Sequence, residues 1–159
     1  MTPRSTCSRS PPHRDLGFAD PSQGLPQALS PFTNRLFPIK LACRAAANLA
    51  TAETWPDLGE FHREAATAAR TLGLEIRRTD EAQRRRGSER RWIALPVGNE
   101  PAAAARRFAA HFTIDRASDG RITGPMGDLG LGNVDEDGRV QLTEAGWALG
   151  RAGTPLLGE

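Results

Sequence analysis

The chain has 159 residues, of which 38% are hydrophobic, and it carries a formal net charge of +2. A chain of this length makes one domain or two small ones with a modest core, which argues against a large enclosed active-site cavity. The positive charge is local, because residues 77–91 hold seven arginines and three acids, a net +4, so the remainder of the chain is −2. A concentrated basic patch of this kind attracts an anionic partner without making the whole surface cationic.

Arginine supplies 20 of the 21 basic residues, in a chain also rich in Ala, Gly and Pro, as GC-rich coding DNA would give. That coding bias lowers the weight of arginine as a sign of nucleic-acid binding. The two cysteines, Cys7 and Cys43, are too few for a disulfide framework and fit a reducing compartment. No stretch approaches the roughly 18 apolar residues of a membrane span, and the N-terminus lacks the apolar core of a secretory signal. We therefore predict a cytoplasmic protein without a membrane partner.

Residues 1–35 hold six prolines among Ser, Gln and Arg, and offer little apolar surface to offset the entropy of ordering them. This segment is predicted to be a disordered tail. Its end, residues 29–37, is more apolar and is a candidate extended arm that docks on the domain that follows.

Two helices are predicted next. Pro38 suits the first turn of a helix, and apolar residues then recur at helical spacing to about Ala50. Thr54 and Asp57 are alternative N-caps for the second helix, in which one apolar stripe leads to Gly73 as the C-cap.

A period of two follows Gly73, which indicates β-structure. Residues 74–77 and 92–95 are predicted as two strands, the second of which stops at Pro96. The polar stretch 79–89 between them is then the tip of a long antiparallel hairpin, which carries most of the arginines into solvent.

A third helix is predicted to open at Glu100 and Pro101, with Asn99 as its cap. Its apolar face holds Phe108 and Phe112, and its opposite face is charged. This helix is expected to join two units of the chain.

The last part of the chain predicts a second hairpin. The glycine-rich segment 124–131 indicates a tight turn and a short, irregular helix. Residues 133–142 then form two short strands around an acidic turn at 135–138, and Thr143 caps a last helix through Trp147 and Leu149.

Leu-Gly-Leu stands before both predicted hairpins, at 72–74 and 129–131, and so the chain contains an internal repeat. The stretch 65–95 resembles the recognition helix and wing of prokaryotic winged helix-turn-helix regulators. The stretch 129–149 resembles a wing followed by the "LTxxG" helix start of such proteins. The resemblance implies an α+β fold made of helical winged-helix-like units with small antiparallel hairpins. The units are 36–97 and 98–159, after the disordered tail 1–35.

The resemblance also implies a function, DNA binding as in a transcriptional regulator, with wing arginines on duplex phosphates and the preceding helix reaching the DNA. The first unit is the candidate, because the acidic turn 135–137 of the second would repel phosphates. The candidate DNA-binding residues are Arg63 and Arg70 on the helix, Arg77 and Arg78 at the base of the hairpin, and Arg84, Arg85, Arg86, Arg90 and Arg91 towards its tip.

Two other interpretations stay open. The arginine loop can be a solvated segment that keeps a small Ala-rich protein soluble. The winged-helix units can instead form a non-catalytic protein-interaction subunit of a larger complex, or a homodimer, with the arm 29–37 and the acidic turn 135–137 as docking surfaces.

No catalytic residue, cofactor site or metal site is predicted, so the chain is not expected to be an enzyme. The cysteines and the three histidines share no ligand spacing, and the glycines make neither a P-loop nor a dinucleotide-binding loop. No serine lies in a G-x-S-x-G context. We expect His62 on a surface turn of a helix and His111 as a partly buried packing residue.

The three tryptophans, Trp55, Trp92 and Trp147, have two readings. Near arginines they can serve as stacking platforms for single-stranded nucleic acid. Core anchoring is favoured, because each lies at a place where a small domain uses its largest side chains.

Overall fold

The computed structural model describes residues 30–51, 53–87, 90, 92 and 94–153. Five helices and two small antiparallel hairpins make up this part of the chain, so the predicted α+β class is confirmed. The elements are α1 (Ser30–Leu49), α2 (Leu58–Ala82), α3 (Pro101–Phe112), β1 (Asp115–Arg116), β2 (Ile122–Thr123), α4 (Pro125–Asp128), β3 (Gly132–Val134), β4 (Val140–Leu142) and α5 (Glu144–Arg151). No helix among the described residues is both long and apolar enough to cross a bilayer.

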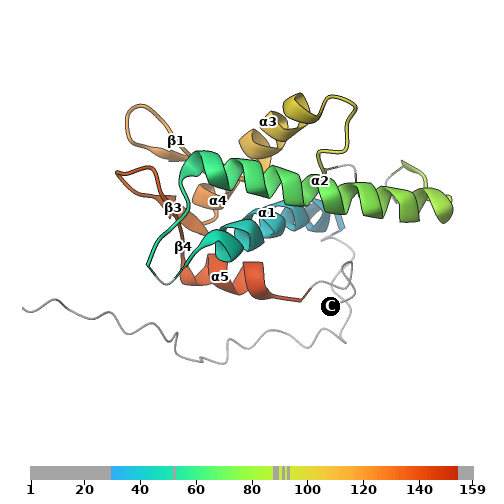
Figure 1. Ribbon diagram of the computed structural model, residues 1–159. Coiled ribbons are helices and arrows are strands. Elements are labelled where there is room, and N and C mark those ends of the chain that lie inside the picture. Colours follow the sequence, from blue (N-terminus) through green and yellow to red (C-terminus); the bar gives the residue numbers. More distant parts are fainter. Residues whose placement is uncertain (1–29, 52, 88–89, 91, 93, 154–159) are drawn as a thin grey trace, which may run out of the picture.

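Helix α1 occupies the centre of the arrangement, with α2 on one side and α5 on the other (Figure 1). Helix α3 packs on α2, and both hairpins gather at the end of the molecule where α2 begins. The core is one cluster of buried side chains, which includes Ala42 of α1, Phe61 of α2, Phe108 of α3 and Val140 of β4. Both predicted units, 36–97 and 98–159, therefore contribute to the same core, and their division stays a prediction.

Helix α1 begins earlier than the sequence indicated. Its backbone is helical from Ser30, so the segment expected as an extended arm, 29–37, is helical over all the residues that are described. A proline in the first turn removes no hydrogen bond, which is why Pro31 is compatible with this start. Pro38 lies inside the helix and is buried. The predicted tail otherwise lies outside the described residues.

Helix α2 begins as predicted and ends nine residues beyond Gly73, at Ala82, with Gln83 as its C-cap. Of the two candidate N-caps, Asp57 is the one used, and its carboxylate accepts a hydrogen bond from the Glu60 amide at 2.8 Å. The predicted strands 74–77 and 92–95 are wrong, because α2 continues through the first and the described residues of the second lie in turns.

Gly73 explains why the end of α2 was placed too early. This glycine allows a close contact with another segment and is not a C-cap. A Cβ added there would lie 2.5 Å from Cγ1 of Val97 and 2.9 Å from Cβ of Leu95. The glycine thus lets residues 95–97 cross the helix at short range. A stripe of buried residues at Ala69, Gly73, Ile76 and Asp80 carries the helical period on through the supposed strand.

The second hairpin agrees with its prediction. Strands β3 and β4 pair antiparallel with Val134 opposite Val140, and the acidic turn joins them. Thr143 caps α5, its hydroxyl accepting from the Gly146 amide at 3.2 Å. Gly146 itself is required, because an added Cβ would lie 1.9 Å from the Leu131 carbonyl oxygen.

The remaining elements of this half differ in detail. The short helix α4 falls within the predicted segment 124–131, whereas α3 is preceded by Glu100 and not Asn99 as its N-cap. The β1–β2 hairpin was not predicted, because two-residue strands are too short to show alternation.

Candidate nucleic-acid interface

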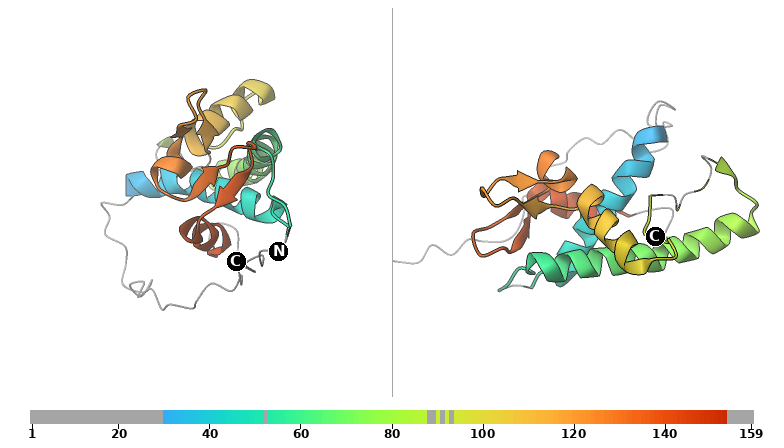
Figure 2. Two further views of the ribbon diagram at one scale, coloured as in Figure 1. Left: turned by 90° about the vertical axis from the view of Figure 1, so that its left-hand side faces the viewer. Right: turned by 90° about the horizontal axis from the view of Figure 1, so that it is seen from above.

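The last turns of α2 and the turn after them hold most of the arginines, and we call residues 77–87 with Arg90 the arginine-rich end. Helix α2 extends here past the helices packed beside it (Figures 1 and 2). The arginines described in it are Arg77, Arg78, Arg84, Arg85, Arg86 and Arg90. Arg91, also predicted as a contact, lies outside the described residues. With the acids Asp80 and Glu81, the six arginines give this surface a net charge of +4.

Both acids of the arginine-rich end are already paired with arginine. Glu81 accepts from Nε of Arg77 at 2.8 Å, one helical turn away. Asp80 is only 1% exposed and lies 3.6 Å from Nε of Arg85. The side chains of Arg78, Arg84, Arg86 and Arg90 are exposed, so their positive charge faces solvent.

Trp92 lies beneath two of these arginines. The guanidinium carbons of Arg77 and Arg90 are 5.1 and 5.8 Å from the centre of its ring, within range of a cation–π attraction. Trp92 is half-buried and packs against the core, as Trp55 and Trp147 also do. Its ring nitrogen is buried and has no hydrogen-bond partner among the described residues.

The end of the helix gives the arginines a structural role as well. Backbone carbonyls at a helix C-terminus carry partial negative charge, which favours cations there. The amide of Gln83 closes the last turn on the Thr79 carbonyl at 2.9 Å. Arg84 then adopts a positive φ of 55°, the left-handed conformation in which helices commonly stop.

The predicted helix residues are not gathered with this end. Nη1 of Arg70 donates to the carbonyls of Pro96 at 2.8 Å and Gly98 at 3.0 Å. Arg70 thus holds the segment that follows Trp92 and returns along α2, which we call the returning segment, against the helix. Arg63 is exposed, but it lies 21 residues before Arg84, about 30 Å along the helix. The predicted arrangement of a recognition helix beside an arginine wing is therefore wrong, because residues 74–77, expected as the first strand of the wing, are part of α2.

An acidic surface lies at the opposite end of the molecule. The β3–β4 turn, with Asp135, Glu136 and Asp137, is joined to the start of α2 by a hydrogen bond from the Leu58 amide to the Gly138 carbonyl, 3.0 Å long. Helix α2 has 25 residues and so separates this turn from the arginine-rich end by about 37 Å. Figure 2 shows both hairpins at one end and the close of α2 at the other.

The histidines differ from expectation. His62 is half-buried, with Nε2 2.8 Å from the Ile114 carbonyl oxygen, and so it links α2 to the segment before β1 instead of lying on a free surface turn. His111 is exposed on the outer side of α3, although it was expected to be partly buried. Its ring contacts Phe112 edge-on.

Groups that could support metal or nucleophilic chemistry are not assembled in the described part of the chain. No cluster there of three His, Cys, Asp or Glu side chains could hold a metal ion. Burial raises the pKa of the Cys43 thiol to about 12, so this cysteine stays protonated at neutral pH. A protonated thiol is a poor nucleophile and a poor metal ligand.

The fold is thus an α+β arrangement with one charged end of each sign. No family model, curated protein or solved structure matches this chain. The likeness to winged helix-turn-helix regulators therefore rests on the sequence pattern of this chain alone.

Proposed function

We propose that this protein binds duplex DNA through the arginine-rich end of α2, by contacts to backbone phosphates. The observation that carries the proposal is a net charge of +4 on a protruding helix end whose two acids are both paired. A guanidinium matches a phosphate with two parallel hydrogen bonds, and phosphate contacts supply most of the affinity of non-specific DNA binding. A transcriptional regulator is one protein class that would use such a surface.

The geometry favours a duplex over a single strand. A helix with its side chains is about 10–12 Å wide, and the major groove of B-DNA is about 12 Å wide, so the end of α2 can enter it. Proteins that bind single strands offer exposed aromatic rings on which bases stack. Near the arginines that are described here, the half-buried ring of Trp92 already has two guanidinium groups over it.

At low salt, the opposite charge at the other end would set the orientation on DNA. Phosphates repel the acidic turn, so the protein approaches a duplex with the close of α2 leading. The expected phosphate contacts are the exposed arginines of this end, which are Arg78, Arg84, Arg86 and Arg90.

The test is fluorescence anisotropy of the full chain with a labelled duplex of random sequence, over a series of salt concentrations. We expect Arg78/Arg84/Arg86→Ala to weaken binding by about tenfold or more at physiological salt. The slope of log K against log salt should fall by up to about 3, since each phosphate contact contributes roughly 0.9. A single strand of the same sequence should bind less tightly than the duplex.

The matched control is Arg106/Arg107/Arg121→Ala, which removes the same charge from exposed positions on α3 and the β1–β2 turn. Its affinity for the duplex should stay close to that of the unmodified protein. Equal losses in the two variants would mean that total charge alone governs binding. Absent or salt-independent binding by the unmodified protein would reject the proposal and favour the alternative of a protein-interaction subunit.

A further inference from the structure

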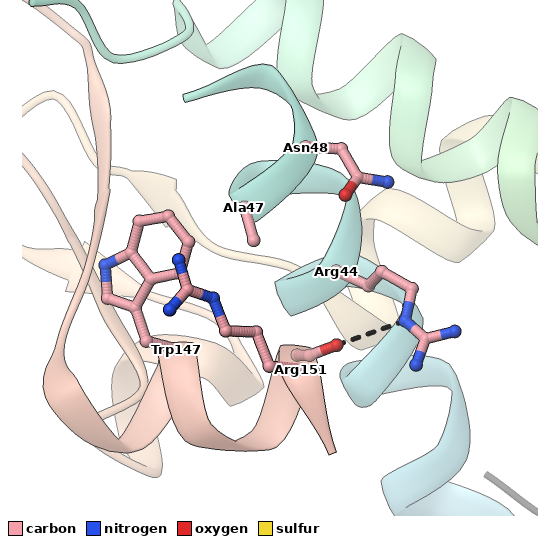
Figure 3. Close-up of a pocket in the computed structure, with 6 residues that line it drawn as sticks. Arg44, Ala47, Asn48, Trp147 and Arg151 are labelled. Carbon is pink, nitrogen blue, oxygen red and sulfur yellow. Dashed lines mark hydrogen bonds between the residues drawn. The ribbon is translucent and has the colours of Figure 1, made fainter. Parts of the chain in front are cut away.

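A groove separate from the arginine-rich end lies between the second half of α1 and the last turns of α5. It has a volume of about 590 Å³. Figure 3 shows its lining, which is Arg44, Ala47, Asn48, Trp147, Gly150 and Arg151. Two of these six residues are arginines and none is acidic. Helix α1 likewise contains no Asp or Glu along its whole length.

Arg151 is held in position by Trp147, one turn earlier on α5. Its guanidinium carbon lies 4.4 Å from the centre of the indole ring, a close cation–π contact (Figure 3). Trp147 is fixed in turn by Trp55, with the two ring centres 5.8 Å apart. No hydrogen bond or ion pair from Arg151 to the described residues is found, so its donors remain available in a fixed place.

Arg44 adds a second positive charge to the groove while binding the end of α5. Its Nε donates to the Gly150 carbonyl and its Nη2 to the Ala152 carbonyl, each at 3.1 Å. Gly150 permits this close approach, because an added Cβ would lie 3.0 Å from backbone atoms of Cys43. In Figure 3 the two guanidinium groups lie on either side of Ala47.

The balance of charge in the groove is positive. Both α1 and α5 end beside it, and each helix C-terminus contributes roughly half a negative charge. The guanidinium groups of Arg44 and Arg151 contribute two full positive charges, so they outweigh the helix ends. An arginine fork meets carboxylates and phosphates with two parallel hydrogen bonds.

We propose that this groove binds a small organic molecule that carries an oxyanion, with its carboxylate or phosphate on the guanidinium of Arg151. The Arg44 charge strengthens the attraction, and the ring of Trp147 holds the Arg151 fork ready, so little side-chain entropy is lost on binding. The inference does not depend on DNA binding, because it involves neither α2 nor the turn after it.

The probe is nuclear magnetic resonance of the indole N–H groups in the full chain, which carries three tryptophans. A Trp147→Phe variant assigns the Trp147 signal, and the Trp92 signal reports separately on the arginine-rich end. Inorganic phosphate and succinate are titrated in separate experiments at constant ionic strength. We expect the Trp147 signal to shift and saturate with at least one anion. The anion that binds distinguishes a phosphate ligand from a carboxylate ligand.

Four variants make the test specific. Arg151→Gln should weaken the anion by at least about tenfold, and Arg151→Lys should weaken it less, because the charge is kept while the fork is lost. Arg121→Gln should leave binding unchanged. The DNA-binding variant Arg78/Arg84/Arg86→Ala should keep the Trp147 response, so the two proposals can fail separately. A Trp147 signal that moves with neither anion, or equally in Arg151→Gln, would overturn the inference.

Discussion

The arginines of α2 have different roles, because some of their side chains contact the rest of the protein and others face solvent. Arg70 and Arg77 lie seven residues apart on one side of the helix, and that side is covered by the returning segment. Arg70 binds two backbone carbonyls, and Arg77 stacks over Trp92. Arg78 follows Arg77 directly, about 100° further round the helix, and is exposed. Only the exposed arginines are offered to a partner.

Gly73 provides a prediction at the scale of one residue. Alanine is favoured over glycine inside a helix by about 1 kcal/mol, so Gly73→Ala would stabilise α2 in isolation. In the folded protein its Cβ would meet Val97 at 2.5 Å and Leu95 at 2.9 Å, and overpacking of this kind costs about 1–3 kcal/mol. We expect a net loss in the free energy of unfolding, measured by urea denaturation.

Gly59 is the control for this change, since it lies in the first turn of the same helix. An added Cβ there would meet the Asp57 carboxylate at 3.3 Å, and that side chain can move slightly. Gly59→Ala should therefore be neutral or slightly stabilising. If Gly73→Ala were as stable as Gly59→Ala, the close crossing of residues 95–97 over α2 would be contradicted.

The length of α2 decides where the charge of the protein is displayed. A helix that stopped at Gly73 would have placed the arginines on a hairpin beside it. The observed helix instead continues to Ala82 and carries them beyond the body of the molecule. The buried Asp80, paired with Arg85, belongs to this last stretch and anchors it.

The end of α2 offers a prediction at the scale of an element. Arg84 has a φ of 55°, and a non-glycine residue in this conformation costs roughly 1–2 kcal/mol. Arg84→Gly should therefore raise the thermal midpoint of unfolding. The relief of this strain is partly offset by the extra chain entropy that glycine loses on folding, which leaves a net gain of up to about 1 kcal/mol. The same change should weaken DNA binding, because it removes an exposed charge.

Arg84→Ala separates the two effects. It removes the same charge but keeps a Cβ in the left-handed conformation, so it should weaken DNA binding without the gain in stability. A thermal midpoint of Arg84→Gly no higher than that of Arg84→Ala would show that the turn after α2 carries no strain at this residue.

At the scale of the whole molecule, charges of opposite sign stand at the two ends of α2. Their separation of about 37 Å exceeds the screening length of about 8 Å at physiological salt. The acidic turn should therefore influence orientation at low salt and contribute little to affinity at physiological salt.

Glu136→Gln/Asp137→Asn tests this separation with two exposed acids. Asp135 is left intact, because its carboxylate accepts hydrogen bonds within the turn, including one of 2.9 Å from the Arg139 amide. We expect duplex affinity to rise measurably at low salt and to change less than about twofold at physiological salt. A large gain at physiological salt would mean that the acidic turn lies close to bound DNA.

The sequence by itself determined the features that depend on near neighbours in the chain. The sequence predicted Thr143 as a cap, Asp57 as one of two candidate caps, the β3–β4 hairpin and the concentration of arginine in 77–91. Each of these features involves residues only a few positions apart. Trp147 and Arg151 of the groove have the spacing of one helical turn, so their contact could be expected from the sequence. No sequence pattern, however, distinguishes a single pair of this kind in a binding site from one on an ordinary surface.

Only the tertiary structure decided the fate of Gly73 and of the arginines around it. Leu74 and Ile76 alternate with polar residues as a strand would, yet Gly73 and Ile76 also fit a helical stripe with Ala69 and Asp80. The sequence does not distinguish a glycine that ends a helix from one that lets another segment cross the helix closely. The contact with residues 95–97, more than twenty positions away, fixed the choice, because packing that closely requires an uninterrupted helix with no side chain at that point.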